Sequence, residues 1–418
     1  MRIVKSVATV IAAAAMLGGI AVADTDLSNY SYASEASTLA PAGGGDVESL
    51  TSLRKKGAVK IGGDINLDVA AIRRDERNND SDQFDRTEFY TQDADLNIKV
   101  DATADASLFI KLDLDDFSDA AIDEREFLEE VYFTWKNVRG SNFTTILGKK
   151  EAPFGLDTTY TITNPYTNNN GNGTYLGKSY PNGGGSNNDH KDVSQTGFTH
   201  PGEVDNVFSG QVNYAYKDLA LFELAVFQNN EKDLQGNRYG QHEDNSEDTL
   251  LLNSYAARTT LKPVEGLSLS LSFINQHLDE YEDETQSIAD GEEDNYAIST
   301  GFDYKLPNAP LRFYGEYLHG WNQQHKDDVD TDTLQLGVVW GVTEKIDLVL
   351  DGEWLNIDND YLANEIDEDF YRLAVAAWYK TDYGVKFGVE YLHEWYDSDN
   401  NWDDADADVF SFRTSYLF

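Results

Sequence analysis

Charged residues recur at every second position inside several apolar segments of this 418-residue chain. In "QDADLNIKVDA", Asp93 and Asp95 alternate with apolar residues, so one face of an extended strand would be polar and the other apolar. Carboxylates fixed on one face raise the local concentration of cations and repel anions. The same alternation gives the full set of candidate polar-face residues: Asp93, Asp95, Lys111, Asp113, Glu130, Arg258, Asp303, Arg312, Glu316, Asp347, Asp351, Glu353, Arg372 and Glu390.

Residues suited to covalent catalysis do not form a recognisable arrangement. An enzyme of that kind needs a nucleophile aligned with a base, and none of the 7 histidines can be paired with a Ser or Thr by spacing. The chain has 0 cysteines, so it offers neither a disulfide framework nor a thiolate metal site. We therefore expect no enzymatic activity, no metal and no other cofactor.

Strands are the elements that must position these charges. Alternating segments of about ten residues predict sixteen strands. They begin near residues 58, 88, 106, 125, 143, 206, 219, 249, 266, 294, 310, 332, 344, 369, 383 and 408.

The links between these strands alternate between short and long. "ATAD", "KDL" and "TDYG" are short links, whereas "HLDEYEDETQSIADGEED" and "YDSDNNWDDADAD" are long ones. Membrane barrels have this asymmetry, with short periplasmic turns and long extracellular loops. The sequence therefore predicts an all-β fold, a closed antiparallel transmembrane β-barrel of about 16 strands.

The start of the chain predicts export. A basic segment, the apolar run "VATVIAAAAMLGGIAV" and a small-residue site indicate a signal peptide over residues 1–23. Residues 24–56, rich in Ser, Ala and Gly, are expected to be a periplasmic leader of little structure. Residues 57–418 would form the barrel in the bacterial outer membrane, with a long third loop over about 156–206.

The last strand ends in "FSFRTSYLF", where Phe410, Phe412, Tyr416 and Phe418 share one face. An alternating strand ending in Phe resembles the C-terminal signature of outer-membrane barrel proteins. Because an open sheet edge is not tolerated in lipid, we expect this strand to pair with the first one and close the ring.

The composition limits the partners. A formal net charge of −43 argues against nucleic acid and phosphate-rich partners. The 24 Tyr, 20 Phe and 7 Trp distinguish the chain from acidic disordered proteins. The expected partners are outer-membrane lipid and lipopolysaccharide, together with small solutes or ions in transit.

A barrel of sixteen strands is wide enough to enclose water. We therefore expect a porin, a water-filled diffusion channel for small hydrophilic solutes. Because acidic residues outnumber basic ones on the predicted inward faces, the channel should prefer cations. The long third loop is expected to fold into the channel and narrow it, and its glycine content leaves a flexible external loop as the alternative. A plugged barrel with a surface-binding or structural role is an alternative.

A resemblance supports the porin interpretation. The segment 129–157, "EEVYFTWKNVRGSNFTTILGKKEAPFGLD", contains Gly148, Lys149, Pro153, Phe154 and Gly155. It resembles a strand–turn–strand segment of the phosphate-selective porin O and P family. The resemblance implies a sixteen-stranded porin that is commonly a homotrimer. Within this chain, the residues themselves indicate that Pro153 ends a strand and Gly155 opens the loop.

This sequence departs from the family in its charges. Phosphate selectors of the family line the channel with an arginine ladder and lysines, whereas the third loop here offers only Lys178, Lys191, His190 and His200. A phosphate site is therefore not expected. Acidic barrels with a similar Pro-Phe-Gly segment occur among proposed siderophore porins, so selective uptake of a ferric siderophore or another chelate is a further alternative.

Overall fold

A computed structural model describes residues 58–76, 84–114, 128–156, 160–163, 207–228, 252–277, 294–323, 328–359, 366–398 and 405–417. The expected signal peptide and leader lie outside these residues, as does most of the expected third loop. None of the described residues forms a helix long and apolar enough to cross a membrane.

The described residues form sixteen β-strands and one short 3₁₀ helix, η4 (Val138–Gly140). The strands are β1 (Ala58–Glu76), β2 (Phe84–Asp101), β3 (Ala106–Asp113), β4 (Leu128–Trp135), β5 (Phe143–Lys150), β6 (Val207–Tyr216), β7 (Ala220–Phe227), β8 (Ser254–Leu261), β9 (Leu267–Gln276), β10 (Asn295–Lys305), β11 (Leu311–Trp321), β12 (Val329–Thr343), β13 (Ile346–Asn359), β14 (Ile366–Lys380), β15 (Val385–Ser398) and β16 (Ala405–Leu417).

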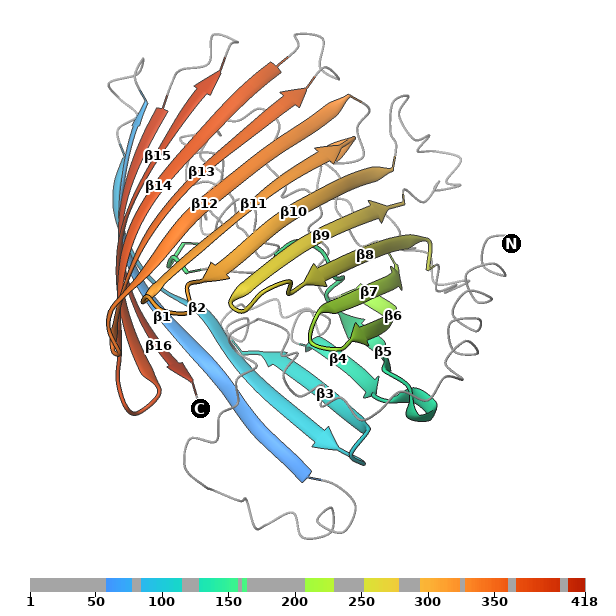
Figure 1. Ribbon diagram of the computed structural model, residues 1–418. Helices are drawn as coiled ribbons and strands as arrows, with labels where there is room; N and C mark the ends of the chain where they lie inside the picture. Colours follow the sequence, from blue (N-terminus) through green and yellow to red (C-terminus); the bar gives the residue numbers. More distant parts are fainter. Residues whose placement is uncertain are drawn as a thin grey trace.

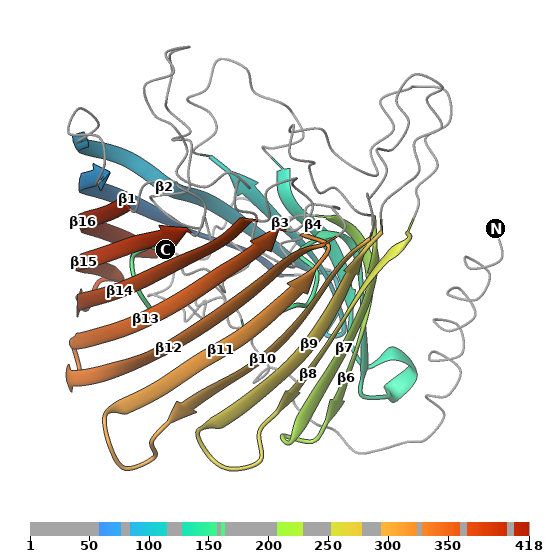
Figure 2. The same ribbon diagram turned by 90° about the horizontal axis from the view of Figure 1, so that it is seen from above.

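Each strand pairs antiparallel with its neighbours in the sequence, and β16 pairs with β1 to close a barrel (Figures 1 and 2). The pairing of β1 with β16 extends from Asp64 opposite Leu417 to Glu76 opposite Ala405. The predicted fold class, the number of strands and the closure by the last strand are confirmed.

The two ends of the barrel differ in their connections. At one end, short turns join the strands, such as 102–105 between β2 and β3, 217–219 between β6 and β7, and 344–345 between β12 and β13. We call this the short-turn end and the opposite end the long-loop end. Lys217 takes a positive φ of 52° in its turn, a backbone conformation that reverses the chain within a few residues.

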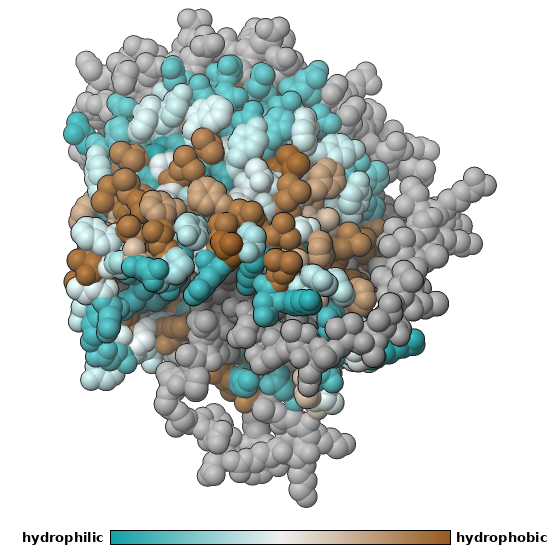
Figure 3. Space-filling model, viewed as in Figure 1, coloured by the Kyte–Doolittle hydropathy of each residue, from teal (hydrophilic) through white to brown (hydrophobic). Residues whose placement is uncertain are grey.

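Strand alternation separates the two faces of the barrel wall. On β13, the apolar Leu348 and Leu350 are 37% and 48% exposed, whereas the intervening Val349 and the following Asp351 are 2% and 1% exposed. The outside is therefore apolar over the middle of the strands, and Figure 3 shows it as a brown band across the barrel. An apolar outside with every strand paired is what a hydrocarbon solvent requires.

Candidate functional site

The charged residues predicted from alternation lie on the inner face wherever their side chains are described. On each strand these charged residues alternate with the exposed apolar residues of the outer face, and they lie on the same face as the buried residues. The side chains of Asp93 and Asp113 are outside the described part, so their orientation stays a prediction. The predicted residues with described side chains on the inner face are Asp95, Lys111, Glu130, Arg258, Asp303, Arg312, Glu316, Asp347, Asp351, Glu353, Arg372 and Glu390.

The four arginines on the described inner face are all held by carboxylates of neighbouring strands. Arg372 lies between Glu353 and Glu394, at 3.0 Å and 3.1 Å, and each carboxylate is directly opposite it in the strand register. These three side chains are almost fully buried, so each charge depends on the others.

The other three arginines follow the same rule. Their pairs are Arg258 with Glu223 at 2.6 Å, Arg413 with Asp68 at 2.6 Å and 2.7 Å, and Arg312 with both carboxylate oxygens of Asp303. Guanidinium groups held by carboxylates on the barrel wall are not arranged to bind anions in transit.

Lysines occupy the inner wall of β3 and β5. Lys111 contacts Asp95 at 2.9 Å and Glu129 at 2.7 Å. On β5, Lys150 lies over the Tyr132 ring and 3.9 Å from Glu130, which places it on the inner face. Alternation in the sequence leaves open whether Lys149 or Lys150 points inward, and these contacts assign the inward position to Lys150.

The chain after β5 enters the barrel. We call its described residues, 151–156 and 160–163, the inner strap. Ala152 and Phe154 pack in one apolar cluster with inner-face residues of β7 to β11, and Phe154 is 0% exposed. The members of this cluster on the barrel wall are Phe227, Ala256, Ile274, Ala297 and Leu318.

Hydrogen bonds hold the same part of the strap. The Gly155 N–H donates to the Ser272 hydroxyl at 2.9 Å, and the Leu156 N–H donates to the Glu316 carboxylate at 2.9 Å. Glu316 also accepts a bond from Ser299. The sequence predicted that Pro153 ends the strand, whereas β5 already ends at Lys150, three residues earlier. Phe154, however, has a role in anchoring the strap that the sequence did not indicate.

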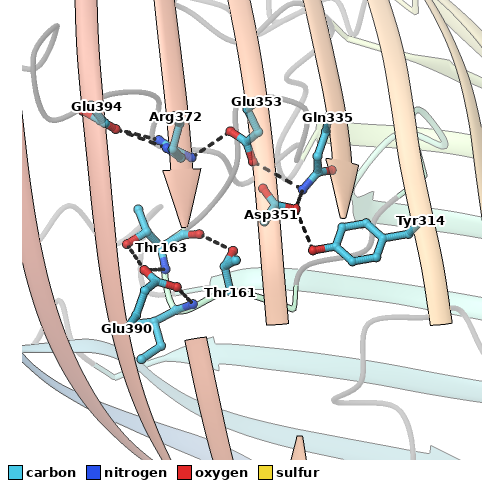
Figure 4. A network of polar contacts seen from close by, with 10 residues as sticks. Thr161, Thr163, Tyr314, Gln335, Asp351, Glu353, Arg372, Glu390 and Glu394 are labelled. Carbon is cyan, nitrogen blue, oxygen red and sulfur yellow. Dashed lines mark hydrogen bonds and ion pairs between the residues drawn. The ribbon is translucent and has the colours of Figure 1, made fainter. Parts of the chain in front are cut away.

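A second attachment lies at residues 161–163, across from β14 and β15 (Figure 4). The carboxylate of Glu390 accepts bonds from the N–H groups of Ile162 and Thr163, at 2.6 Å and 3.0 Å, and from the Thr163 hydroxyl at 2.7 Å. The indole N–H of Trp378 donates to the Tyr160 carbonyl at 2.9 Å. The strap therefore follows the inner wall from β7 to β15.

Between the two attachments, Tyr160 contacts the charged wall. Its hydroxyl donates to Asp303 at 3.1 Å, its ring lies 4.7 Å from the Arg312 guanidinium and its centroid is 4.6 Å from that of Tyr314. Tyr314 in turn donates to Asp351 at 2.6 Å, and Gln335 donates to the same oxygen at 3.0 Å.

A glycine makes room for the Tyr314 ring. A Cβ added at Gly337, the residue opposite Tyr314, would lie 2.1 Å from the ring, so a larger residue there would displace the tyrosine. The same holds for Gly388, where an added Cβ would lie 2.7 Å from Trp378. These glycines let the aromatic rings lie along the wall and reach the strap.

Sequence reasoning missed several inner-face residues. Asp68, Glu223, Glu394 and Arg413 all fall on inward positions, and alternation alone could have found them. Their pairing depends on strand register, however, and Asp68 and Arg413 are 345 residues apart in the chain.

Comparison with known proteins identifies the fold. No family model matches the chain, and no curated protein matches it. Among solved structures, the outer membrane channel DcaP of Acinetobacter baumannii is similar with a TM-score of 0.57 and 13% identity, covering 87% of this chain and 98% of that one. OprB of Pseudomonas putida has a TM-score of 0.54 and 13% identity, with 88% and 96% covered.

A third similar structure is OmpT, an outer membrane protein of Vibrio cholerae, with a TM-score of 0.51 and 12% identity, covering 87% of this chain and 98% of that one. The chain thus has the fold of outer-membrane porins, that of an integral outer-membrane β-barrel. The resemblance to the phosphate-selective family is supported at the level of this fold and not at the level of phosphate selection.

Proposed function

We propose that this protein is an outer-membrane porin, a water-filled diffusion channel for small hydrophilic solutes that prefers cations. The observation that carries the proposal is a closed barrel with an apolar outside and an inner face on which carboxylates outnumber basic groups. The carboxylates are Asp64, Asp68, Asp95, Asp101, Glu130, Glu223, Asp303, Glu316, Asp347, Asp351, Glu353, Glu368, Glu390 and Glu394, and the bases are Lys60, Lys99, Lys111, Lys150, Arg258, Lys305, Arg312, Arg372, Lys380, Lys386 and Arg413.

The pattern of pairing supports cation preference further. The inner arginines are held by carboxylates, so their charge is compensated at the wall. Two inner carboxylates, Asp351 and Glu390, accept their described hydrogen bonds from neutral donors instead of from a base. A field of one sign inside a low-dielectric wall concentrates ions of the opposite sign.

The same pairing argues against phosphate selection. A phosphate site needs guanidinium or ammonium groups whose hydrogen bonds are directed at the ligand. Here the guanidinium of Arg372, for example, is used by Glu353 and Glu394. We therefore favour a general channel over a phosphate-selective one.

The position of the inner strap supports the proposal that the channel is narrowed. Because it is attached to β7–β11 and to β14–β15, it takes up space along one side of the barrel interior. The short-turn end would face the periplasm and the long-loop end the exterior, in contact with outer-membrane lipid and lipopolysaccharide. The resemblance of residues 129–157 implies a homotrimer.

Planar-bilayer recording tests the proposal. Purified protein should give discrete, ohmic conductance steps, and a salt gradient should give a reversal potential of the sign expected for cations. The variant Asp347→Asn, at an inner-face position, should lower the preference, whereas Glu344→Gln in the exposed turn should leave it unchanged. Absence of conductance, or a reversal potential of the anion sign, would refute it.

A further inference from the structure

The outer face carries the same four-residue arrangement twice. On β11, Tyr317, His319 and Trp321 occupy successive outward positions, and on β15 Tyr391, His393 and Trp395 do the same. In the strand register, His319 is opposite Asp332 of β12 and His393 is opposite Asp408 of β16. We call these the β11 cluster and the β15 cluster.

The hydrogen bonds within the two clusters are also the same. In the β11 cluster, the Tyr317 hydroxyl and the His319 Nδ1 both contact Asp332 Oδ1, at 2.5 Å and 2.8 Å. In the β15 cluster, the corresponding contacts of Asp408 Oδ1 are 2.6 Å from the tyrosine and 2.9 Å from the histidine. One carboxylate oxygen therefore receives both internal contacts.

This arrangement leaves the same two kinds of polar atom without a hydrogen bond in each cluster, as far as the described part of the protein shows. Within the described residues, neither Oδ2 of the aspartates nor Nε2 of the histidines has a hydrogen bond. The aspartate side chains are 31% and 43% exposed. A tryptophan adjoins each imidazole, at 4.3 Å and 5.3 Å between ring centroids. Each cluster thus combines two polar groups with an aromatic surface.

The clusters lie at one height on the barrel. Following paired residues from His319 to β15 leads through Asp332, Asn356 and Asp369 to Asp397, four residues beyond His393. A residue advances about 3.3 Å along a strand, and neighbouring strands lie about 4.8 Å apart. When strands tilt by about 35°, residues at equal height are therefore offset by one residue per strand from the paired residues. The offset of four residues over the four steps from β11 to β15 matches this. Membrane barrels have tilts of about 35–45°.

This height is toward the long-loop end, because β11 and β15 run from short turns to their last residues there. Under the proposed function, on which this inference rests, that end meets the outer leaflet. We infer that each cluster binds the sugar headgroup of an outer-leaflet glycolipid. Sugar hydroxyls can bond to the carboxylate oxygen and the imidazole nitrogen, while the C–H face of the sugar packs on the tryptophan.

The aspartates favour the sugar over a phosphate group as the bound part of the lipid. A carboxylate accepts hydrogen bonds from hydroxyl groups, whereas it repels a phosphate unless a cation lies between them. Phospholipids with a phosphate next to the acyl chains should therefore bind the β11 cluster less well than glycolipids. At the β15 cluster this difference should be smaller, because Arg73 of β1 lies opposite Asp408 in the strand register.

The third outward histidine provides a natural control. His277 Nδ1 contacts Asp294 Oδ1 at 2.8 Å, but the other oxygen of Asp294 accepts from Asn275 and Tyr296. Both oxygens of that carboxylate are used within the protein. A substitution at His277 should therefore leave glycolipid binding unchanged.

Native mass spectrometry of the detergent-purified barrel tests the inference, with a purified dephosphorylated diglucosamine glycolipid carrying core sugars as the probe and phosphatidylglycerol as the comparison. We expect two tightly bound glycolipids per chain. Trp321→Ala should weaken glycolipid binding at the β11 cluster at least tenfold, and Trp395→Ala should do the same at the β15 cluster, so that each variant retains one tightly bound glycolipid. The Asp332→Asn/Asp408→Asn double variant should weaken binding at both clusters. His277→Ala and Trp340→Ala, which alters an outward residue near the short-turn end, should retain two.

Three results would overturn the inference: retention of both glycolipids by the Trp321→Ala/Trp395→Ala double variant, equal binding of phosphatidylglycerol, or loss of binding when EDTA removes bridging cations. Heat-dependent gel migration establishes that each variant has a folded barrel. Conductance is measured separately. A barrel that conducts ions but binds no glycolipid refutes only this inference. A barrel that binds glycolipid but does not conduct ions refutes only the proposed function.

Discussion

The inner wall of β7–β11 and the inner wall of β14–β15 hold the same strap by different means. The first buries Phe154 among apolar side chains, whereas the second presents the Glu390 carboxylate to backbone N–H groups. On β7–β11, the apolar residues of the inward face therefore mark where the barrel packs against its own chain. Charged residues on an inward face do not by themselves mark contact with water, since Glu390 is 1% exposed.

The largest effect is expected at the apolar wall. Phe154→Ala removes a fully buried ring, and the cavity left should lower the free energy of unfolding by about 3–5 kcal/mol. Detachment of the strap should also raise single-channel conductance. Urea unfolding in lipid vesicles and bilayer recording measure the two effects. Phe313→Ala, an outward change at a residue 39% exposed, is the control. Equal effects of the two variants would contradict the packing role of Phe154.

A comparable loss is expected at the charged wall. Arg372→Met would leave Glu353 and Glu394 buried without their base, which should cost about 3–5 kcal/mol of unfolding free energy. Adding Glu353→Leu and Glu394→Leu should recover most of this loss, because the uncompensated charges are then gone. Failure of the triple variant to recover would show that Arg372 stabilises the wall by some means other than charge pairing.

A smaller effect is expected where the strap meets Glu390. Glu390→Gln keeps the size of the side chain but replaces a carboxylate that accepts three hydrogen bonds with a neutral amide, at a cost of about 1–2 kcal/mol. The open-channel current should become noisier as the strap detaches intermittently. Glu344→Gln, in an exposed turn, should change neither quantity. An unchanged current in Glu390→Gln would contradict the second attachment.

The smallest effect is expected at an ion pair outside the wall. The hydrogen bond from Lys345 to Asp382, in exposed turns, raises the pKa of the Lys345 ammonium. A raised pKa stabilises the fold below the ordinary lysine value of about 10.4, and the contribution disappears as pH rises through the folded-state pKa. Because the pair is solvent-exposed, Lys345→Gln should leave unfolding unchanged from about pH 5 to about pH 9. If Lys345→Gln lowered the free energy of unfolding as much as Arg372→Met does, burial would not be what makes the Arg372 ion pairs important for stability.

Much of the fold could be predicted because alternation is a local signal. β1, β3 and β5 begin at the expected residues 58, 106 and 143, and the closure of the barrel followed from the need to pair every strand. The expected starts of β2 and β8, near 88 and 249, were off by a few residues, since strand ends depend on turn and loop geometry that alternation does not record.

The site was predictable only in part. Alternation placed residues such as Asp351 on the inner face, but it could not tell which carboxylates would pair with arginines, since this depends on register between strands. It also could not show that Phe154 would pack inside the barrel, because its partners lie on five strands that come later in the chain. The sequence signal that could have indicated this packing was a break in alternation, such as the three consecutive apolar residues Ala225, Val226 and Phe227, which are all buried.

The position of the strap inside the barrel can be tested by a designed disulfide. A Cβ added at Gly301 on β10 would lie 3.2 Å from the Leu156 Cβ, close to the roughly 3.5–4.5 Å that disulfides need, and the chain has no cysteine of its own. The Gly301→Cys/Leu156→Cys variant should therefore crosslink almost completely on mild oxidation in membranes, as shown by gel mobility before and after reduction. Leu156→Cys combined with Gly352→Cys on the outer face should not crosslink; absence of a disulfide in the first variant would contradict an inner strap held against the wall.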